Sequence, residues 1–159
     1  MKLEQDKFCV RPVYAEEYED VMGLAWKTFL RFEGDLFSPE GIKSFQNFIT
    51  NETLKKLFDT GQYPIFVAVY CNEIVGMLSL RCKTHISLLF VDEHYHYMGV
   101  GKKLMEYACT YIQKELDEFK VTVHASPYAV GFYHKMGFTD MADEIEEDGV
   151  RYTPMSLIL

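Results

Sequence analysis

Two glycines and two lysines lie close together at the end of the polar segment 92–98, which follows an apolar run. Gly99 and Gly101 flank a single residue, and Lys102 and Lys103 follow at the start of a helical pattern. Backbone N–H groups at a helix start are unpaired, and glycine lets an anion approach them closely. The helix dipole and both lysines favour negative charge there. This order of residues is typical of a phosphate-binding loop.

Other chemistries fit the same stretch less well. A dinucleotide fingerprint needs a third glycine near Leu104 and repeated parallel βαβ units, and both are missing from the sequence. A P-loop has the pattern GxxxxGK[ST], and the residues around Gly101-Lys102 do not match it. His94 and His96 could bind a metal, but no Cys or His follows at zinc-finger spacing, so we expect no metal site. Taken alone, the stretch is also compatible with an ordinary helix start that binds no ligand.

Composition predicts an ordinary globular protein. The chain has 159 residues, of which 48% are hydrophobic, so we expect a single domain over residues 1–159 with a real core. The four cysteines form no CxxC pair, and no apolar run approaches the ~20 residues of a membrane helix. We therefore expect a cytoplasmic protein. The net charge of −8 argues against nucleic-acid and membrane partners and is compatible with a cationic substrate.

The pattern of apolar residues predicts alternating helices and strands. Ser38-Pro39 is a helix start, and a break is expected near Asn51. The apolar end of the strand at 85–91 predicts burial on both faces. The order is β-α-α-β-β-β-α-β-α-β, which predicts a mixed sheet covered by helices, in the α/β or α+β class. The expected strands are 8–13, 65–70, 74–80, 85–91, 121–123 and 151–159, and the expected helices are 16–32, 39–61, 99–115 and 127–136.

Two motifs in this order resemble the GNAT superfamily of acetyl-CoA-dependent N-acetyltransferases. The first reads His96-Tyr97-Met98-Gly99-Val100-Gly101, against the family signature (Gln/Arg)-x-x-Gly-x-(Gly/Ala). The second reads from Ser126 to Tyr133, then Gly137-Phe138, against Asn-x-x-Ala-x-x-x-Tyr and Gly-Phe. The resemblance covers about residues 8–159. It implies a mostly antiparallel central sheet flanked by about four helices.

The resemblance also implies an acetyl-CoA site. The main chain of the central strand would pair with the pantetheine arm, and the signature loop would hold the pyrophosphate. His96 stands where the family has Gln or Arg, and Ser126 where it has Asn, so we expect weaker cofactor contacts. The implied cofactor-binding residues are Leu89, Phe90, Val91, His96, Tyr97, Met98, Gly99, Val100, Gly101, Lys102, Ser126 and Tyr133.

The implied reaction is direct attack of a primary amine on the acetyl thioester in a ternary complex. The family assigns protonation of the departing thiolate to the tyrosine at position 133, and a phenol of pKa ~10 suits a thiolate of ~8.5. An amine of pKa ~10 must first lose a proton, for which His85 and Glu33 are candidates, and so is a water chain. His124 is a further polar group at a strand end. Cys109 falls among apolar helix positions, so we expect it in the core.

The acceptor and the assembly stay open at this point. A small-molecule amine and a peptide amine both fit, and an exposed sheet edge would allow a homodimer. Two rival functions also remain. The first is a non-catalytic acyl-CoA-binding or regulatory module, and the second is a nucleotide-binding protein that uses the same loop.

Overall fold

The structure, a computed structural model, describes residues 8–159. In that part of the chain, eight strands form one sheet in the order β1-β2-β3-β4-β5-β8-β6, and β7 pairs with β8. All neighbours are antiparallel except β4 and β5, which run parallel. The strands are β1 (Phe8–Pro12), β2 (Ile65–Tyr70), β3 (Glu73–Arg81), β4 (His85–Val91), β5 (Lys120–Ala125), β6 (Thr139–Asp140), β7 (Ile145–Glu147) and β8 (Val150–Ile158).

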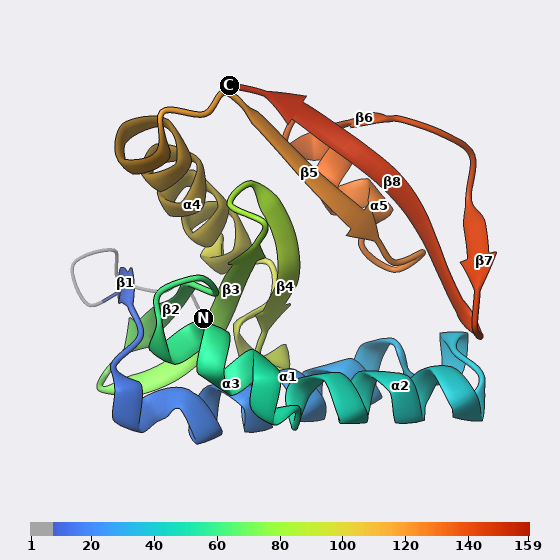
Figure 1. Ribbon diagram of the computed structural model, residues 1–159, viewed down its shortest axis with the longest axis horizontal. Helices are drawn as coiled ribbons and strands as arrows, with labels where there is room; N and C mark the ends of the chain where they lie inside the picture. Colours follow the sequence, from blue (N-terminus) through green and yellow to red (C-terminus); the bar gives the residue numbers. More distant parts are fainter. Residues whose placement is uncertain (1–7) are drawn as a thin grey trace.

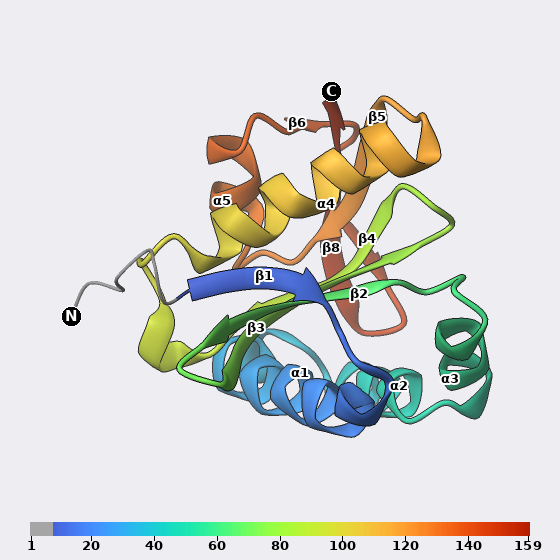
Figure 2. The ribbon, with the colours of Figure 1, turned by 90° about the vertical axis from the view of Figure 1, so that its left-hand side faces the viewer.

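Helices cover both faces of the sheet (Figures 1 and 2). The helices α1 (Tyr18–Phe32), α2 (Pro39–Ile49) and α3 (Glu52–Asp59) lie on one face, and α4 (Val100–Leu116) and α5 (Val130–Lys135) lie on the other. Each face has its own apolar cluster, around Val67 and Met77 on the first and around Leu78 and Leu104 on the second. The predicted mixed, mostly antiparallel sheet flanked by helices is confirmed.

The predicted helix start and the predicted helix break are both present as caps. The Ser38 hydroxyl accepts a hydrogen bond from the Gly41 N–H at 3.1 Å, with Pro39 in the first turn of α2. Asn51 Oδ1 accepts from the Thr53 N–H at 2.7 Å and thereby starts α3. Side chains that satisfy these otherwise unpaired N–H groups fix where each helix begins.

Apart from small shifts at other ends, one helix start and two strands differ from the sequence expectation. The short helix α5 begins at Val130 instead of residue 127, because the N–H groups of Ala129 and Val130 both turn back to the Ser126 carbonyl. The strands β6 and β7 were not predicted. β7 is short, acidic and mostly exposed, so its sequence lacks apolar alternation. It pairs with β8 through Asp148-Gly149, both with positive φ, as a two-residue hairpin turn requires.

The end of β4 is the feature that positions the site. Its register against β3 shifts around Ser87, and it pairs with β5 only at His85↔Thr122 and Ile86↔Val123. Beyond Ile86 the two parallel strands diverge, as Figure 1 shows. The apolar end of β4 packs on both faces as predicted, with Leu88 and Phe90 against the first cluster and Leu89 and Val91 against the second. Residues 89–91 are half-buried and not fully buried, because no strand lies along their β5 side.

Candidate active site

The divergence of β4 and β5 leaves an opening between two parallel strands at their carboxyl ends. Along residues 87–91, the edge of β4 that faces β5 has no strand partner in the described sheet. Backbone groups on such an edge can pair with another extended chain. Ligands of α/β proteins commonly bind just outside the carboxyl ends of parallel strands. The opening can therefore hold an extended polar ligand against the main chain of Leu89, Phe90 and Val91.

The glycine segment lies at the carboxyl end of β4 and opens α4. Gly99 is the N-cap, with φ of 81°, a conformation that glycine adopts without strain. Gly101 has a packing role, because a Cβ there would lie 3.2 Å from the Phe132 ring on α5. No acidic residue occurs in the first turn, and Lys102 is exposed beside it. These features fit an anion at the N-terminus of α4.

The other residues of the signature loop differ in what they contact. His96 Nε2 donates to the Val91 carbonyl oxygen at 2.7 Å, since a carbonyl can only accept, and its ring stacks on Phe32 at 4.5 Å. That nitrogen therefore binds the protein itself. Tyr97 is fully exposed with φ of 61°, Met98 is half-buried, and Val100 is buried in the core with only its main chain facing the loop.

Glu33 follows the last residue of α1 and is the one carboxylate counted among the buried side chains of the described chain, at 9% exposure. Its N–H donates to the Phe29 carbonyl and completes the last turn of the helix. Burial raises the pKa of the Glu33 carboxyl, and the neighbouring Ser126 hydroxyl opposes that shift. The buried Ser126 Oγ has no hydrogen bond of standard geometry among the described residues. Glu33 and Ser126 are thus adjacent polar groups at the opening.

Tyr133 approaches the same point from the opposite face of the sheet. It is 4% exposed, and its ring packs edge-to-face against Phe132 and Phe138. Burial raises the pKa of the Tyr133 phenol, and the negative charge of Glu33 raises it further. A phenol in this setting keeps its proton at neutral pH. The structure therefore brings a carboxylate of raised pKa, a protonated phenol and a serine hydroxyl together at the opening.

His85 lies apart from this group, at the start of β4 where the two strands still pair. Its Nε2 faces the Arg81 guanidinium at 3.4 Å and must accept, so Nδ1 donates to Thr122 Oγ1 at 2.8 Å. The pKa of His85 is lowered to about 4 by burial, by Arg81 and by His124. Both ring nitrogens already have partners. Of the two predicted bases, the geometry favours Glu33.

An aromatic wall beside the opening was not expected from the sequence. The Phe32 ring, at the end of α1, lies 5.2 Å from the Tyr128 ring and stacks on the His96 ring. Tyr128 precedes α5 and His96 belongs to the signature loop, so three separate segments contribute to this wall. Tyr128 occupies an unspecified position (x) of the second motif, so the motif did not predict a role for it. Cys109 is half-buried, and burial raises the pKa of its thiol to about 11, as expected of a core residue.

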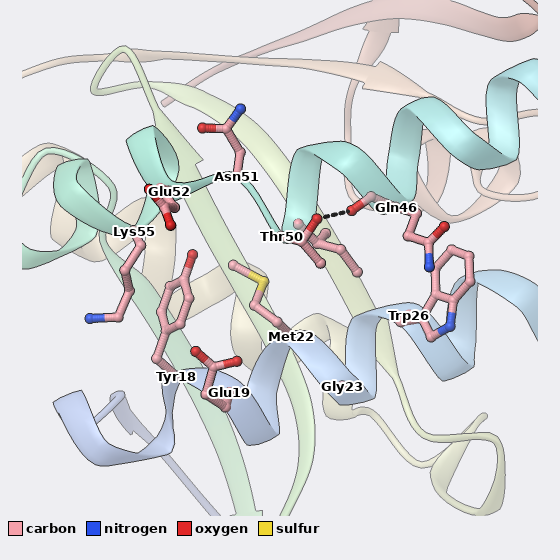
Figure 3. Close-up of a pocket in the computed structure, with 11 residues that line it drawn as sticks. Tyr18, Glu19, Met22, Gly23, Trp26, Gln46, Thr50, Asn51, Glu52 and Lys55 are labelled. Atoms are coloured by element: carbon pink, nitrogen blue, oxygen red, sulfur yellow. Dashed lines mark hydrogen bonds between the residues drawn. The ribbon is translucent and has the colours of Figure 1, made fainter.

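Two pockets flank α1 and α2. A pocket of about 330 Å³ borders Ser126 and the β7–β8 hairpin. A pocket of about 380 Å³ lies at the other end of α1, where Tyr18 and Met22 face the junction of α2 and α3 at Thr50 and Asn51 (Figure 3). It contains none of the predicted site residues, and Tyr18 is about 20 Å along α1 from Glu33.

Within residues 8–159, no group of three or more His, Cys, Asp or Glu side chains is arranged to hold a metal ion. The same part of the chain contains no helix of sufficient length and apolarity to cross a bilayer.

A family model described as an acetyltransferase (GNAT) domain matches residues 34–159. The chain belongs to the GNAT family. A curated relative, the peptidyl-lysine N-acetyltransferase YjaB of Salmonella typhimurium, is 34% identical over 100 residues, which cover 60% of this chain and 64% of that protein. The match thus spans somewhat less than two thirds of the relative's length.

Solved structures of the family share the fold of this GNAT chain. A GCN5-related N-acetyltransferase from Rhodopseudomonas palustris superimposes with a TM-score of 0.82 at 22% identity, over 100% of this chain and 99% of that one. The PaiA N-acetyltransferase of Thermoplasma acidophilum, solved with coenzyme A, gives 0.79 at 17% identity, over 96% and 99%. Acetyl-CoA is the acetyl donor of the family, and the open strand edge and the helix N-terminus fit it.

Proposed function

We propose that this protein transfers the acetyl group of acetyl-CoA to a primary amine by direct attack in a ternary complex. The observation that carries the proposal is the meeting of Glu33 and Tyr133. They come from helices on opposite faces of the sheet, and the charge of Glu33 acts on the Tyr133 phenol. Both lie at the opening between β4 and β5, where an extended acyl donor has free main-chain groups to pair with.

Acetyl-CoA would be held mainly by backbone. The main chain of residues 89–91 would pair with the pantetheine arm, and the α4 N-terminus from Gly99 to Gly101 would bind the pyrophosphate, with Lys102 beside it. Ser126 has a buried hydroxyl beside the Glu33 carboxyl that can also contact the ligand. His96 would act indirectly, since its ring fixes the Val91 carbonyl at the end of β4. Tyr97 and Met98 would line the loop.

Glu33 would serve as the base. The amine nitrogen attacks the acetyl carbon only when its lone pair is free, and at neutral pH an alkylamine of pKa ~10 is protonated. A carboxylate with a raised pKa is a stronger base than an exposed one. A protonated amine gives one proton to solvent before attack, and Glu33 takes the second proton, directly or through water, as the nitrogen bonds to the acetyl carbon. The Ser126 hydroxyl beside it can orient either the amine or that water.

Tyr133 would serve as the acid. The carbon–sulfur bond breaks as the tetrahedral intermediate collapses, and the phenol gives its proton to the departing thiolate. The products are the acetamide and coenzyme A. A proton is then present on Glu33 and missing from Tyr133. The charge of Glu33 acts on the Tyr133 phenol, and return of that proton to the phenolate, directly or through water, would restore the site for the next turnover.

The test is release of coenzyme A thiol from acetyl-CoA, measured with and without a panel of primary amines. The proposal predicts thiol release that depends on the amine and yields the acetylated product. Acetyl-CoA, and neither NAD nor ATP, should raise the melting temperature. Tight acetyl-CoA binding without amine-dependent release would contradict catalysis and support a non-catalytic acyl-CoA-binding module. Stabilisation by NAD or ATP would support a nucleotide-binding protein.

A further inference from the structure

The pocket beside Ser126 adjoins the proposed base through that serine. Its volume is about 330 Å³, and Ser126 is at once a wall of this pocket and the neighbour of the Glu33 carboxyl. His124 and Ser126 alternate with the core residues of β5, so both face the side of the sheet that α1 and α2 cover. The full lining is Phe37, Ser44, His124, Ser126, Glu147, Asp148, Val150, Arg151 and Tyr152.

We propose that this pocket binds the acceptor and that the acceptor is a short aliphatic diamine or polyamine. One amine would reach Glu33 beside Ser126, and the second, protonated amine would bind the carboxylates of Glu147 and Asp148. This inference rests on the proposed function, because it names the class of amine that the same site acetylates.

The charges of the lining favour a cation. Glu147 and Asp148 both line the pocket, and the one Lys or Arg of the lining is Arg151. Arg151 stands directly opposite Glu146 in the hairpin register, so its charge lies within a group of three carboxylates. His124 adds no positive charge at neutral pH, because burial and Arg81 lower its pKa more than Glu147 raises it.

The hairpin holds these carboxylates at a fixed place. Glu147 Oε2 accepts a hydrogen bond from the Tyr152 hydroxyl at 3.2 Å, and the Tyr152 ring stacks on His124 at 4.3 Å. The turn docks on the start of α2, where the Ser38 N–H donates to the Gly149 carbonyl at 3.4 Å. Contact is close enough that a Cβ on Gly41 would lie 2.7 Å from that carbonyl oxygen. The acidic end of the pocket is therefore tied to both β5 and α2.

Other acceptor classes fit these charges less well. A simple alkylamine has no second amine for the carboxylates of Glu147 and Asp148 to bind. An amino acid would bring a carboxylate towards them, and Arg151 alone would favour it. The chemical group at the far end of the acceptor therefore distinguishes the classes.

The experiment compares kcat/KM for three acceptors with similar chains and different distal groups: n-butylamine, putrescine and γ-aminobutyrate. We expect putrescine to exceed n-butylamine by roughly threefold to tenfold, the range for two partly exposed charge pairs, and γ-aminobutyrate to be the poorest. The putrescine advantage should shrink as salt is added, because exposed charges are screened. A series of longer α,ω-diamines and spermidine then finds the preferred spacing.

The matched variants are Glu147→Gln with Asp148→Asn, and Glu144→Gln as the control. Gln can still accept from Tyr152, and Asn tolerates the positive φ of residue 148. In the double variant the ratio of putrescine to n-butylamine should fall towards one. Glu144 is exposed on the same acidic segment and does not line the pocket, so its variant should keep the wild-type ratio. These ratios do not depend on how much of each variant is folded.

Three results would overturn the inference. Equal kcat/KM for putrescine and n-butylamine would show that the second amine is not bound. Preference for γ-aminobutyrate would make Arg151 the anchor and the acceptor an amino acid. Release of no thiol with any amine, despite acetyl-CoA binding, would overturn the proposed function together with this inference, whereas the first two results leave acetyl transfer intact.

Discussion

At the scale of single residues, burial gives Glu33 the raised pKa of a base. Glu33→Gln keeps the size of the side chain and removes the base, so turnover should fall by ~10²–10⁴. Acetyl-CoA affinity should change little. In the wild-type protein, activity should rise with pH through the raised pKa of Glu33, because the carboxyl must be ionised to act. The pH–rate profile of the variant should lack the rise through the pKa of Glu33 and keep the rise near pH ~10 that comes from the substrate amine. A variant with an unchanged profile would exclude Glu33 as the base.

His85 should affect acid stability and not catalysis. Its pKa is about 4 in the folded protein and ~6.5 in the unfolded chain, so the unfolded state binds the proton more readily. The free energy of unfolding should therefore fall as pH drops from ~6.5 towards 4, by about 1–2 kcal/mol after allowance for solvent screening. His85→Asn should flatten this fall when urea denaturation is compared across the window.

Turnover at neutral pH separates the two roles of His85. We expect His85→Asn to keep most of the wild-type rate. A loss of ~10² or more, with acetyl-CoA binding intact, would return His85 to the position of base.

The sequence identified the candidate site residues, but it did not show which of the candidate bases acts. Tyr133, Glu33 and Ser126 were all predicted, and the fold places them together. The choice of Glu33 over His85 depends on which polar groups surround each side chain, and those partners come from distant segments such as Arg81, Thr122 and Ser126. Spacing along the chain does not contain that information.

At the scale of elements, α1 carries a buried hydroxyl that lowers stability. Tyr18 is 4% exposed, and its hydroxyl has no hydrogen-bond partner within residues 8–159. Tyr18→Phe should therefore leave the free energy of unfolding unchanged or raise it by up to about 1 kcal/mol. Tyr63 is the matched control: its hydroxyl bonds Ser79 and Ser87 at 2.7 and 2.8 Å.

Tyr63→Phe should lower the free energy of unfolding by about 1–3 kcal/mol, because the buried Ser79 and the half-buried Ser87 both lose their partner. Urea denaturation measures both variants. A large destabilisation by Tyr18→Phe would mean that its hydroxyl has a partner, such as a ligand or an ordered water in the pocket of Figure 3.

The contact between α4 and α5 gives a second pair of variants. Gly101→Ala places a methyl group 3.2 Å from the Phe132 ring, so we expect a loss of about 1–3 kcal/mol and displacement of the helix that carries Tyr133. Gly131→Ala meets no atom within 4 Å and sits in α5, so it should stabilise by about 0.5–1 kcal/mol. Equal effects of the two substitutions in thermal unfolding would contradict this packing role.

Elements with strong periodicity were predicted, and those that depend on neighbours were not. The long helices, the strands β2 to β5 and the caps at Ser38 and Asn51 follow from local pattern. β7 exists because β8 lies opposite it, and its own residues are acidic and exposed. The half-buried end of β4 results from the departure of β5, which is a tertiary event that an apolar run does not reveal.

At the scale of the whole molecule, the sheet has few hydrogen-bonded pairs between β4 and β5, where the opening lies. Two residue pairs connect the strands, whereas β3 and β4 pair along their length. A ligand that bridges the opening should tie the two halves together, and acetyl-CoA at 100 times its Kd should add about 2.7 kcal/mol of stability. That the chain is one domain and that it forms a homodimer stay predictions.

The measurement that tests the central claim most directly is amine-dependent thiol release by Tyr133→Phe, compared with the wild-type protein at saturating acetyl-CoA. Phe keeps the ring between Phe132 and Phe138 and removes only the acid, so the Kd of acetyl-CoA should change little and turnover should fall by ~10²–10⁴. Turnover near the wild-type value, with a lowered melting temperature, would show that the Tyr133 hydroxyl is structural and would contradict the proposed mechanism.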